Sequence, residues 1–167
     1  VLEDMEEIDR WVLHRLQEVI KRVREAYEKY QFHMVYYTLY NFCTVDLSAL
    51  YLDVLKDRLY TAKAASPARR SGQTAMYMIL EAMTRLLAPM LTFTAEEIWA
   101  AMPAFEGKAA SVHLTRFPDV NESYMNADLG ERWKTLIAIK GEISKAIEMA
   151  RKNKVVGHPL DATVTVC

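Results

Sequence analysis

The residues best suited to chemistry lie near the middle of the chain, in the stretch NFCTVDLSALYLDVLKDRLY at residues 41–60. A helix with about 100° per residue would place Asp46, Asp53 and Asp57 on one stripe, together with Lys56 and Tyr60. These carboxylates match neither a metal-binding nor a catalytic motif. We therefore expect these aspartates to face water or neighbouring helices. On a solvated face, one intrahelical ion pair would link Lys56 to Asp53 or Asp57.

Arg58 is the unusual residue of this stretch, because it falls on the apolar side of the predicted helix. The other residues predicted on this side are Leu47, Tyr51, Val54 and Leu55. An arginine in such a place either extends its guanidinium group out to solvent or is held by a specific contact.

A local excess of positive charge follows, because residues 58–70 contain Arg58, Lys63, Arg69 and Arg70 but no acidic residue. Such a cluster could bind the phosphate backbone of an RNA. The alternative is that Arg69 and Arg70 simply begin a helix, although cations in a first turn oppose the helix dipole. The sequence leaves both interpretations open.

Other kinds of site lack their full set of residues. The chain has no HExxH motif, no glycine-rich phosphate loop and no GxSxG motif, so we expect no catalytic residue, no metal ligand and no cofactor. The two cysteines fit neither a disulfide framework nor a zinc site. We expect surface or capping roles for the four histidines, which are His14, His33, His113 and His158.

The composition favours one helical, globular domain. The chain has 167 residues, of which 51% are hydrophobic and 26% charged, with only five glycines and five prolines. A net charge of -1 gives no overall attraction to nucleic acid or membranes, so any such partner needs a local basic cluster. No leader and no apolar run of about 20 residues is present, and we expect a reduced, cytoplasmic protein cut from a longer polypeptide.

Apolar residues recur at helical spacing in every long segment, which predicts an all-α fold, an antiparallel helical bundle. We expect Trp11, Leu47 and Ile79 in its core, and core rather than base-stacking roles for all three tryptophans. The predicted helices span residues 4–30, 33–60, 75–87, 94–102 and 127–154.

Local signals predict where these helices begin and end. Thr94 and Glu97 have the spacing of a capping box, which would start the fourth helix. Pro89 and Pro103 should end the third and fourth helices, and Gly157 with Pro159 should end the last one.

Five segments carry a resemblance to a known family. They are DRWVLHRL (9–16), EAYEKYQFH (25–33), YNFCTVDLSALYLDVLKDRLY (40–60), SPARRSGQT (66–74) and LLAPMLTFTAEEIW (86–99). Together they resemble the anticodon-binding helical domain of isoleucyl-tRNA synthetases, over most of the chain. LAPMLTF is also similar to the valyl and leucyl enzymes, whereas VDLSALYLDVLKDRLY with FTAEEIW is typical of the isoleucyl branch.

The resemblance implies that the parent protein is a class I ligase that joins isoleucine to its tRNA at the expense of ATP. Residues 1–157 would form the bundle that holds the anticodon stem-loop, and residues 158–167 would begin the next segment. The HIGH-like and KMSKS-like signatures and the cysteine-rich zinc segment of the family are absent, so this part should not be catalytic. The implied partners are the tRNA for isoleucine and the catalytic and C-terminal domains of the parent chain.

In the related methionyl enzyme the helix end that corresponds to residues 47–60 approaches the anticodon. Together with the basic cluster, this predicts six RNA-facing residues: Lys56, Arg58, Tyr60, Lys63, Arg69 and Arg70. The resemblance also implies that a helix with an Arg-Asn pair normally precedes Val1 and contributes to anticodon reading.

Two other functions remain open at this point. The chain could be the corresponding domain of a valyl enzyme, or a helical scaffold for protein contacts with no role in RNA binding. An exposed groove of methionine and aromatic side chains would favour the scaffold, and a joined basic face would favour RNA.

Overall fold

The computed structural model describes residues 2–158 and 161–165, so Pro159 and Cys167 lie outside the described residues. The chain divides into two compact units, Val1–Met125 and Asn126–Cys167. The predicted boundary between residues 157 and 158 stays a prediction. Within the described ranges the fold is helical with no β-strand, which confirms the predicted all-α class.

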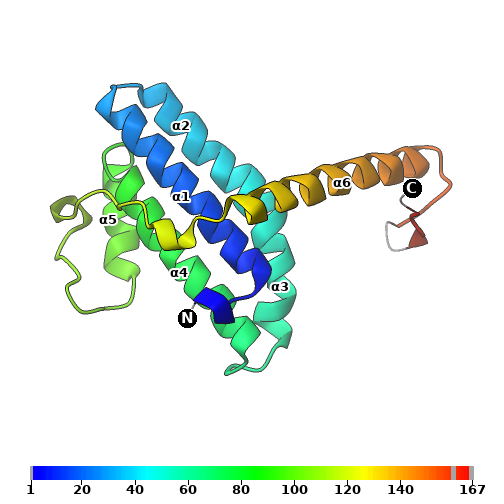
Figure 1. Cartoon of the computed structure of the whole chain (residues 1–167), viewed down its shortest axis with the longest axis horizontal. Helices are drawn as coiled ribbons and strands as arrows, with labels where there is room; N and C mark the ends of the chain where they lie inside the picture. Colours follow the sequence, from blue (N-terminus) through cyan, green and yellow to red (C-terminus); the bar gives the residue numbers. More distant parts are fainter. Residues whose placement is uncertain (1, 159–160, 166–167) are drawn as a thin grey trace. The chain divides into compact units, whose positions relative to one another are not determined.

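The first unit contains the helices that form the bundle (Figure 1). Its long elements are α1 (Glu7–Glu28), α2 (Phe32–Asn41), the π-helical segment η2 (Phe42–Tyr51), α3 (Leu52–Thr61), α4 (Pro67–Leu87) and α5 (Thr92–Ala101). Three short 3-10 turns complete it: η1 (Leu2–Asp4), η3 (Val112–Leu114) and η4 (Glu122–Tyr124).

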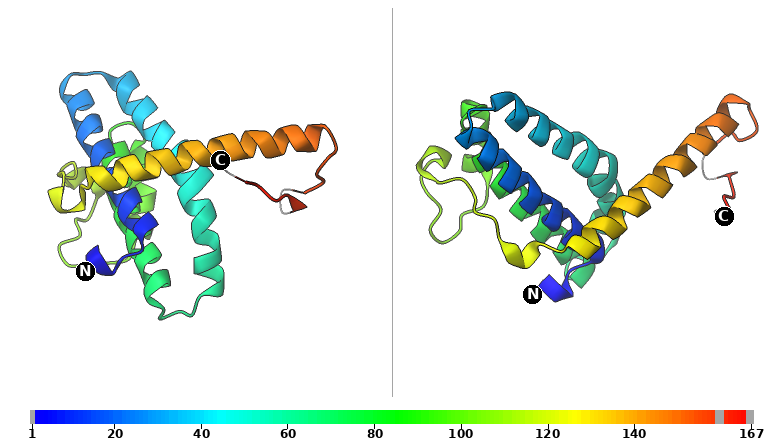
Figure 2. Two further views of the ribbon diagram at one scale, coloured as in Figure 1. Left: turned by 45° about the vertical axis from the view of Figure 1, so that its right-hand side comes forward. Right: turned by 45° about the horizontal axis from the view of Figure 1, so that its top comes forward.

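Helix α1 lies between α2 and α4 (Figure 2) and runs antiparallel to α2. Helix α4 runs in the same direction as α1, because Ser71 at its start bonds to Glu6 and Leu86 at its end bonds to Tyr27. Its apolar stripe fills the centre of the bundle, where Trp11 is 1% exposed and Val12 and Leu13 are fully buried. Trp11 and Ile79 are buried as predicted, the latter 6% exposed. Leu47 is only half-buried, so its prediction as a core residue is wrong.

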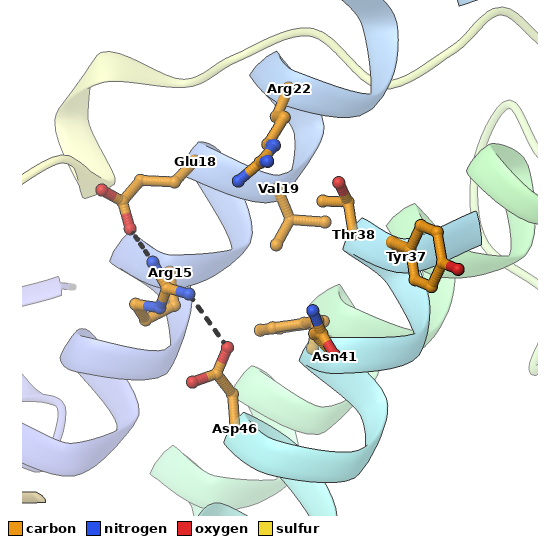
Figure 3. Close-up of a pocket in the computed structure, with 9 residues that line it drawn as sticks. Arg15, Glu18, Val19, Arg22, Tyr37, Thr38, Asn41 and Asp46 are labelled. Atoms are coloured by element: carbon orange, nitrogen blue, oxygen red, sulfur yellow. Dashed lines mark hydrogen bonds and ion pairs between the residues drawn. The ribbon is translucent and has the colours of Figure 1, made fainter. Parts of the chain in front are cut away.

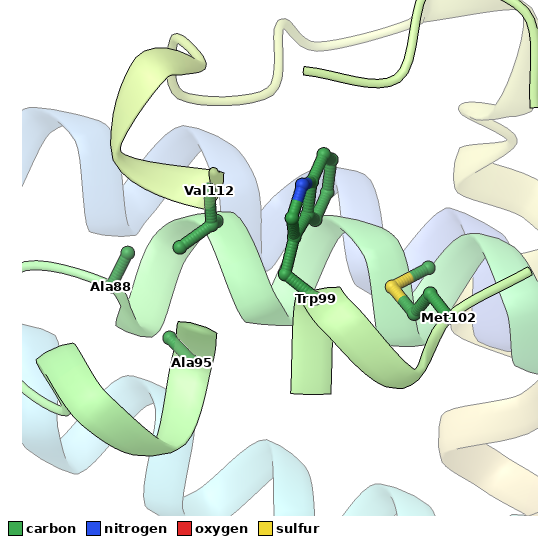
Figure 4. Close-up of a cluster of buried hydrophobic side chains, with 5 residues drawn as sticks. All are labelled: Ala88, Ala95, Trp99, Met102 and Val112. Atoms are coloured by element: carbon green, nitrogen blue, oxygen red, sulfur yellow. The ribbon is translucent and has the colours of Figure 1, made fainter. Parts of the chain in front are cut away.

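A second hydrophobic cluster joins α5 to the end of α4 and to η3. It consists of Ala88, Ala95, Trp99, Met102 and Val112 (Figure 4). The indole Nε1 of Trp99 donates to the carbonyl oxygen of Ala109 at 2.9 Å, so the polar atom of the ring is satisfied although the side chain is buried.

Helices α4 and α5 end at Leu87 and Ala101, each two residues before the proline that was predicted to end it, Pro89 or Pro103. The predicted capping box is wrong. Helix α5 already begins at Thr92, with Leu91 at its N-cap and no side-chain cap, so Thr94 lies inside its first turn.

The start of α4 also differs from the prediction, since the helix begins at Pro67 rather than near residue 75. Ser66 is its N-cap and accepts a hydrogen bond from the backbone N–H of Arg69 at 3.3 Å, and proline suits the first helical position. One turn later, Gly72 allows α4 to approach α3. A Cβ there would lie 2.5 Å from Cδ1 of Leu55.

Helix α1 ends with a residue in the left-handed region, Tyr30, at a φ of 54°. The N–H of Gln31 bonds to the carbonyl of Ala26 at 2.8 Å, and the N–H of Tyr30 bonds to that of Tyr27 at 3.1 Å. This is the hydrogen-bond pattern of a Schellman motif, with tyrosine where glycine is usual.

The second unit contains α6 (Ala127–Lys152), which Asn126 caps through a 2.9 Å hydrogen bond from the N–H of Leu129. The helix ends at Lys152, two residues before the predicted end at Lys154, and Gly157 lies beyond its cap. Lys154, at a φ of 58°, takes the left-handed position instead. Trp133 is half-buried in this unit, whereas Trp11 and Trp99 of the first unit are core residues as predicted.

Candidate RNA-facing site at the turn between α3 and α4

A buried carboxylate lies directly behind this turn. Asp9 of α1 has no exposed surface. Arg58 binds it with two nitrogens, NH2 to Oδ1 at 2.7 Å and NH1 to Oδ2 at 2.9 Å. The hydroxyl of Tyr51 donates to Oδ1 at 2.9 Å, and the hydroxyl of Ser71 donates to Oδ2. One carboxylate thus binds side chains from η2, α3 and α4 to α1.

The electrostatics of this cluster keep each group in the form that bonds. Hydrogen bonding to Asp9 raises the pKa of Arg58, so the guanidinium group stays charged. Burial, and then the charge of Asp9, raises the pKa of Tyr51, so its hydroxyl stays protonated and can donate. The sequence allowed Arg58 either to extend its guanidinium group to solvent or to be held by a specific contact. The structure shows the contact, with Asp9.

The turn itself is held by two arginines that reach across it. NH1 of Arg58 in α3 donates to the carbonyl of Ala68 in α4 at 3.3 Å. NH1 of Arg69 in α4 donates to the carbonyl of Ala62, just after α3, at 3.1 Å. Arg69 lies in the first turn of α4. The sequence had left open that this arginine simply begins a helix, and it does so here.

The other four predicted residues point away from the bundle. Tyr60 is 83% exposed, and Lys63 and Arg70 are exposed and make no ion pair in the described part of the chain. Lys56 is also exposed and pairs with Asp53 at 3.0 Å, as predicted. The structure thus separates the six residues into two that fix the turn and four that are displayed around it.

The predicted aspartate stripe is only partly solvated. Asp46 is 14% exposed and pairs with Arg15 of α1 at 3.1 Å, so it faces a neighbouring helix rather than the solvated face. It lies in η2, where π-helical hydrogen bonds run from residue i to i+5, and a wheel drawn for an α-helix gives the wrong directions there.

Histidines and acidic residues do not form a metal site here. In the described ranges no group of three or more His, Cys, Asp or Glu side chains could hold a metal ion. His14 is 4% exposed and lies on the core side of α1, so the prediction of a surface or capping role is wrong for this histidine.

An apolar groove of about 450 Å³ lies between η2, α4 and α5. Its walls include Cys43, Leu47, Met76, Tyr77 and Met83. Burial raises the pKa of the Cys43 thiol, which keeps it protonated. This is the kind of methionine and aromatic groove that favours a protein contact, and it occurs on the same unit as the basic turn.

Comparison with known proteins assigns the family. A family model described as "Anticodon-binding domain of tRNA ligase" matches residues 9–166. The chain belongs to this family. The domain is 53% identical over 158 residues to an isoleucine–tRNA ligase of Syntrophotalea carbinolica, which covers 95% of the chain. It is 46% identical over 162 residues, or 97% of the chain, to the isoleucine–tRNA ligase of Geobacter sulfurreducens.

The domain spans 17% of the length of each of these two relatives. None of the helices in the described residues is both long enough and apolar enough to cross a bilayer.

Proposed function

We propose that this domain binds the anticodon stem-loop of the tRNA for isoleucine, within a longer isoleucine–tRNA ligase. The observation that carries the proposal is the match of a tRNA ligase anticodon-binding family over residues 9–166. The relatives support the isoleucyl rather than the valyl enzyme, because both are named isoleucine–tRNA ligases.

The basic turn between α3 and α4 is the RNA contact that we propose. Lys63 and Arg70 are free to bind phosphates, because neither is committed to an acidic side chain. Tyr60 can stack on an unpaired base, which is worth about 1 to 3 kcal/mol in other RNA-binding proteins. Lys56 adds charge at the edge, while Arg58 and Arg69 keep the turn rigid.

Salt dependence of tRNA binding tests this contact in the full-length ligase. Each lost phosphate contact flattens the log-log salt slope by about 0.7 to 0.9, so the double variant K63A/R70A should flatten it by about 1.4 to 1.8. The control K21A/K29A removes two exposed cations of α1 and its vicinity and should leave the slope unchanged.

An unchanged slope in K63A/R70A would overturn the contact at this turn. If instead a variant of Lys140, Lys145, Arg151 and Lys152 loses both affinity and slope, the RNA contact belongs to α6.

The domain itself has no adenylation activity under this proposal. ATP, and in many family members zinc, would serve other domains of the ligase, which we place in the cytoplasm. Purified domain should therefore show no isoleucine-dependent pyrophosphate exchange, and exchange above the background of a protein-free control would contradict the assignment.

The apolar groove is the surface through which we propose that the domain contacts the rest of the ligase, its second partner. The relatives are several times longer than this chain, and an exposed apolar surface of this kind marks a protein contact. Cys43 reports on it, because its thiol lines the groove. A maleimide should label Cys43 faster in the isolated domain than in the full-length ligase, as followed on the peptide that contains Cys43. Equal labelling rates would mean that the groove stays open in the ligase.

A further inference from the structure

A second pocket, of about 350 Å³, lies between α1 and the α2–η2 segment (Figure 3). Its volume is within the range of about 300 to 1,000 Å³ that small-ligand sites occupy. Arg15 and Arg22 reach it from α1, and Tyr37, Thr38 and Asn41 from α2. Its lining shares no residue with the basic turn or with the apolar groove.

Several polar groups in this pocket have no partner within the described residues. Oγ1 of Thr38 is buried and unbonded, although a buried polar atom without a hydrogen bond costs about 1 to 3 kcal/mol. Thr44 and Thr84, by contrast, donate to the carbonyl four residues earlier at 2.9 and 2.7 Å. The amide of Asn41 and the guanidinium group of Arg22 are likewise uncommitted, and Figure 3 shows both at the edge of the gap.

The pocket is lined by two arginines and two carboxylates, and both carboxylates pair with Arg15. Arg15 lies between Glu18 and Asp46 and bonds to both. Burial by itself lowers the pKa of Arg15, but the ion pair with Asp46 outweighs it, and the net effect raises this pKa. Arg15 is therefore charged and holds both carboxylates, so the guanidinium group of Arg22, which makes no ion pair in the described part of the chain, keeps its donors for a ligand.

The wall that faces Arg22 is suited to an aromatic ligand. The ring of Tyr37 is 57% exposed and offers a flat face, and α2 contains no acidic residue, so the two carboxylates of the lining are Glu18 and Asp46, which pair with Arg15. The amide of Asn41 supplies hydrogen-bond donors and an acceptor beside it. A ligand that satisfies Arg22, Tyr37 and Asn41 needs an acceptor group such as a phosphate, a flat ring and polar atoms at the edge of that ring.

We propose that this pocket binds one unpaired nucleotide of the bound tRNA, with its phosphate on Arg22 and its base against Tyr37. Asn41 then bonds the edge of the base. This inference rests on the proposed function, since it adds a second contact for the same RNA, away from the turn between α3 and α4.

Two single variants of the full-length ligase test the pocket by tRNA binding at several salt concentrations. R22A should weaken binding about tenfold and flatten the salt slope by about 0.7, because it removes one phosphate contact. N41A should weaken binding severalfold at an unchanged slope, since it removes no charge. K21A is the matched control: it removes a neighbouring, exposed cation of α1 outside the pocket and should change neither quantity.

Photocrosslinking locates the contact and identifies its source. Irradiated ligase–tRNA complex should yield a crosslinked α2 peptide that contains Tyr37, and an excess of free mononucleotides should not suppress it. Suppression by mononucleotides would overturn tRNA as the source of the ligand. If the ligase binds tRNA but R22A and N41A bind as tightly as the wild type, the pocket is overturned and the proposed function stands. If the wild-type ligase binds no tRNA, both fall.

Discussion

Removal of Arg58 should destabilise the domain because it leaves a buried carboxylate without its counter-ion. Asp9 has no exposed surface, and in R58A only the hydroxyls of Tyr51 and Ser71 would still donate to it. Loss of one partner of a buried ion pair costs about 3 to 5 kcal/mol. The Arg58 side chain is 19% exposed, so water can replace part of its interaction, and we expect about 3 kcal/mol.

Urea denaturation followed by far-UV circular dichroism measures this loss. R58K should fall between wild type and R58A, because lysine keeps the charge but cannot form two parallel hydrogen bonds with the carboxylate. K56A is the control, since its ion pair with Asp53 is exposed and should be worth less than about 1 kcal/mol.

The reasoning fails if R58A costs no more than this exposed control. It also requires coupling: in a double-mutant cycle, D9N and R58A together should cost clearly less than the sum of the two single changes. Additive losses would show that the two side chains do not act as a pair.

Three further predictions concern stability. Y30G should raise the unfolding free energy by about 1 kcal/mol, because glycine adopts a positive φ without the strain of a tyrosine; a loss in urea denaturation would contradict it. W99A should cost about 3 to 5 kcal/mol by emptying the second cluster, and a loss near zero would remove Trp99 from that core. Burial raises the pKa of Tyr27 to about 12, so stability should be complete below about pH 10 and fall as the pH rises toward that value. The fall should be smaller in Y27F, and equal pH profiles would exclude Tyr27 as its cause.

The helices could be predicted from the sequence because each buries one apolar stripe, and the spacing of Trp11, Leu16 and Val23 already shows that of α1. The same rule failed between residues 42 and 51, because it assumes α-helical geometry and this segment is π-helical. Asp46 therefore faces Arg15 rather than solvent.

The partners in the candidate sites could not be predicted in this way. Asp9 and Arg58 are 49 residues apart, and hydrophobic spacing does not say which residues of two helices meet. One signal for a buried Asp9 was available. This carboxylate comes just before Trp11 and Val12, which are both buried, on a helix that lies in the core. The pocket beside Thr38 left no motif, because its residues come from separate helices and each is ordinary for an exposed helix face.

The close approach at Gly72 has a consequence for the thermodynamics of binding. Because this glycine lets α4 lie against Leu55 of α3, the two helices are in contact directly below their connecting turn. Lys63 and Arg70 are then displayed on a backbone that is already ordered before any ligand arrives. A binding surface of this kind loses little backbone entropy on association, so more of each phosphate interaction appears as net affinity than for cations on a flexible loop.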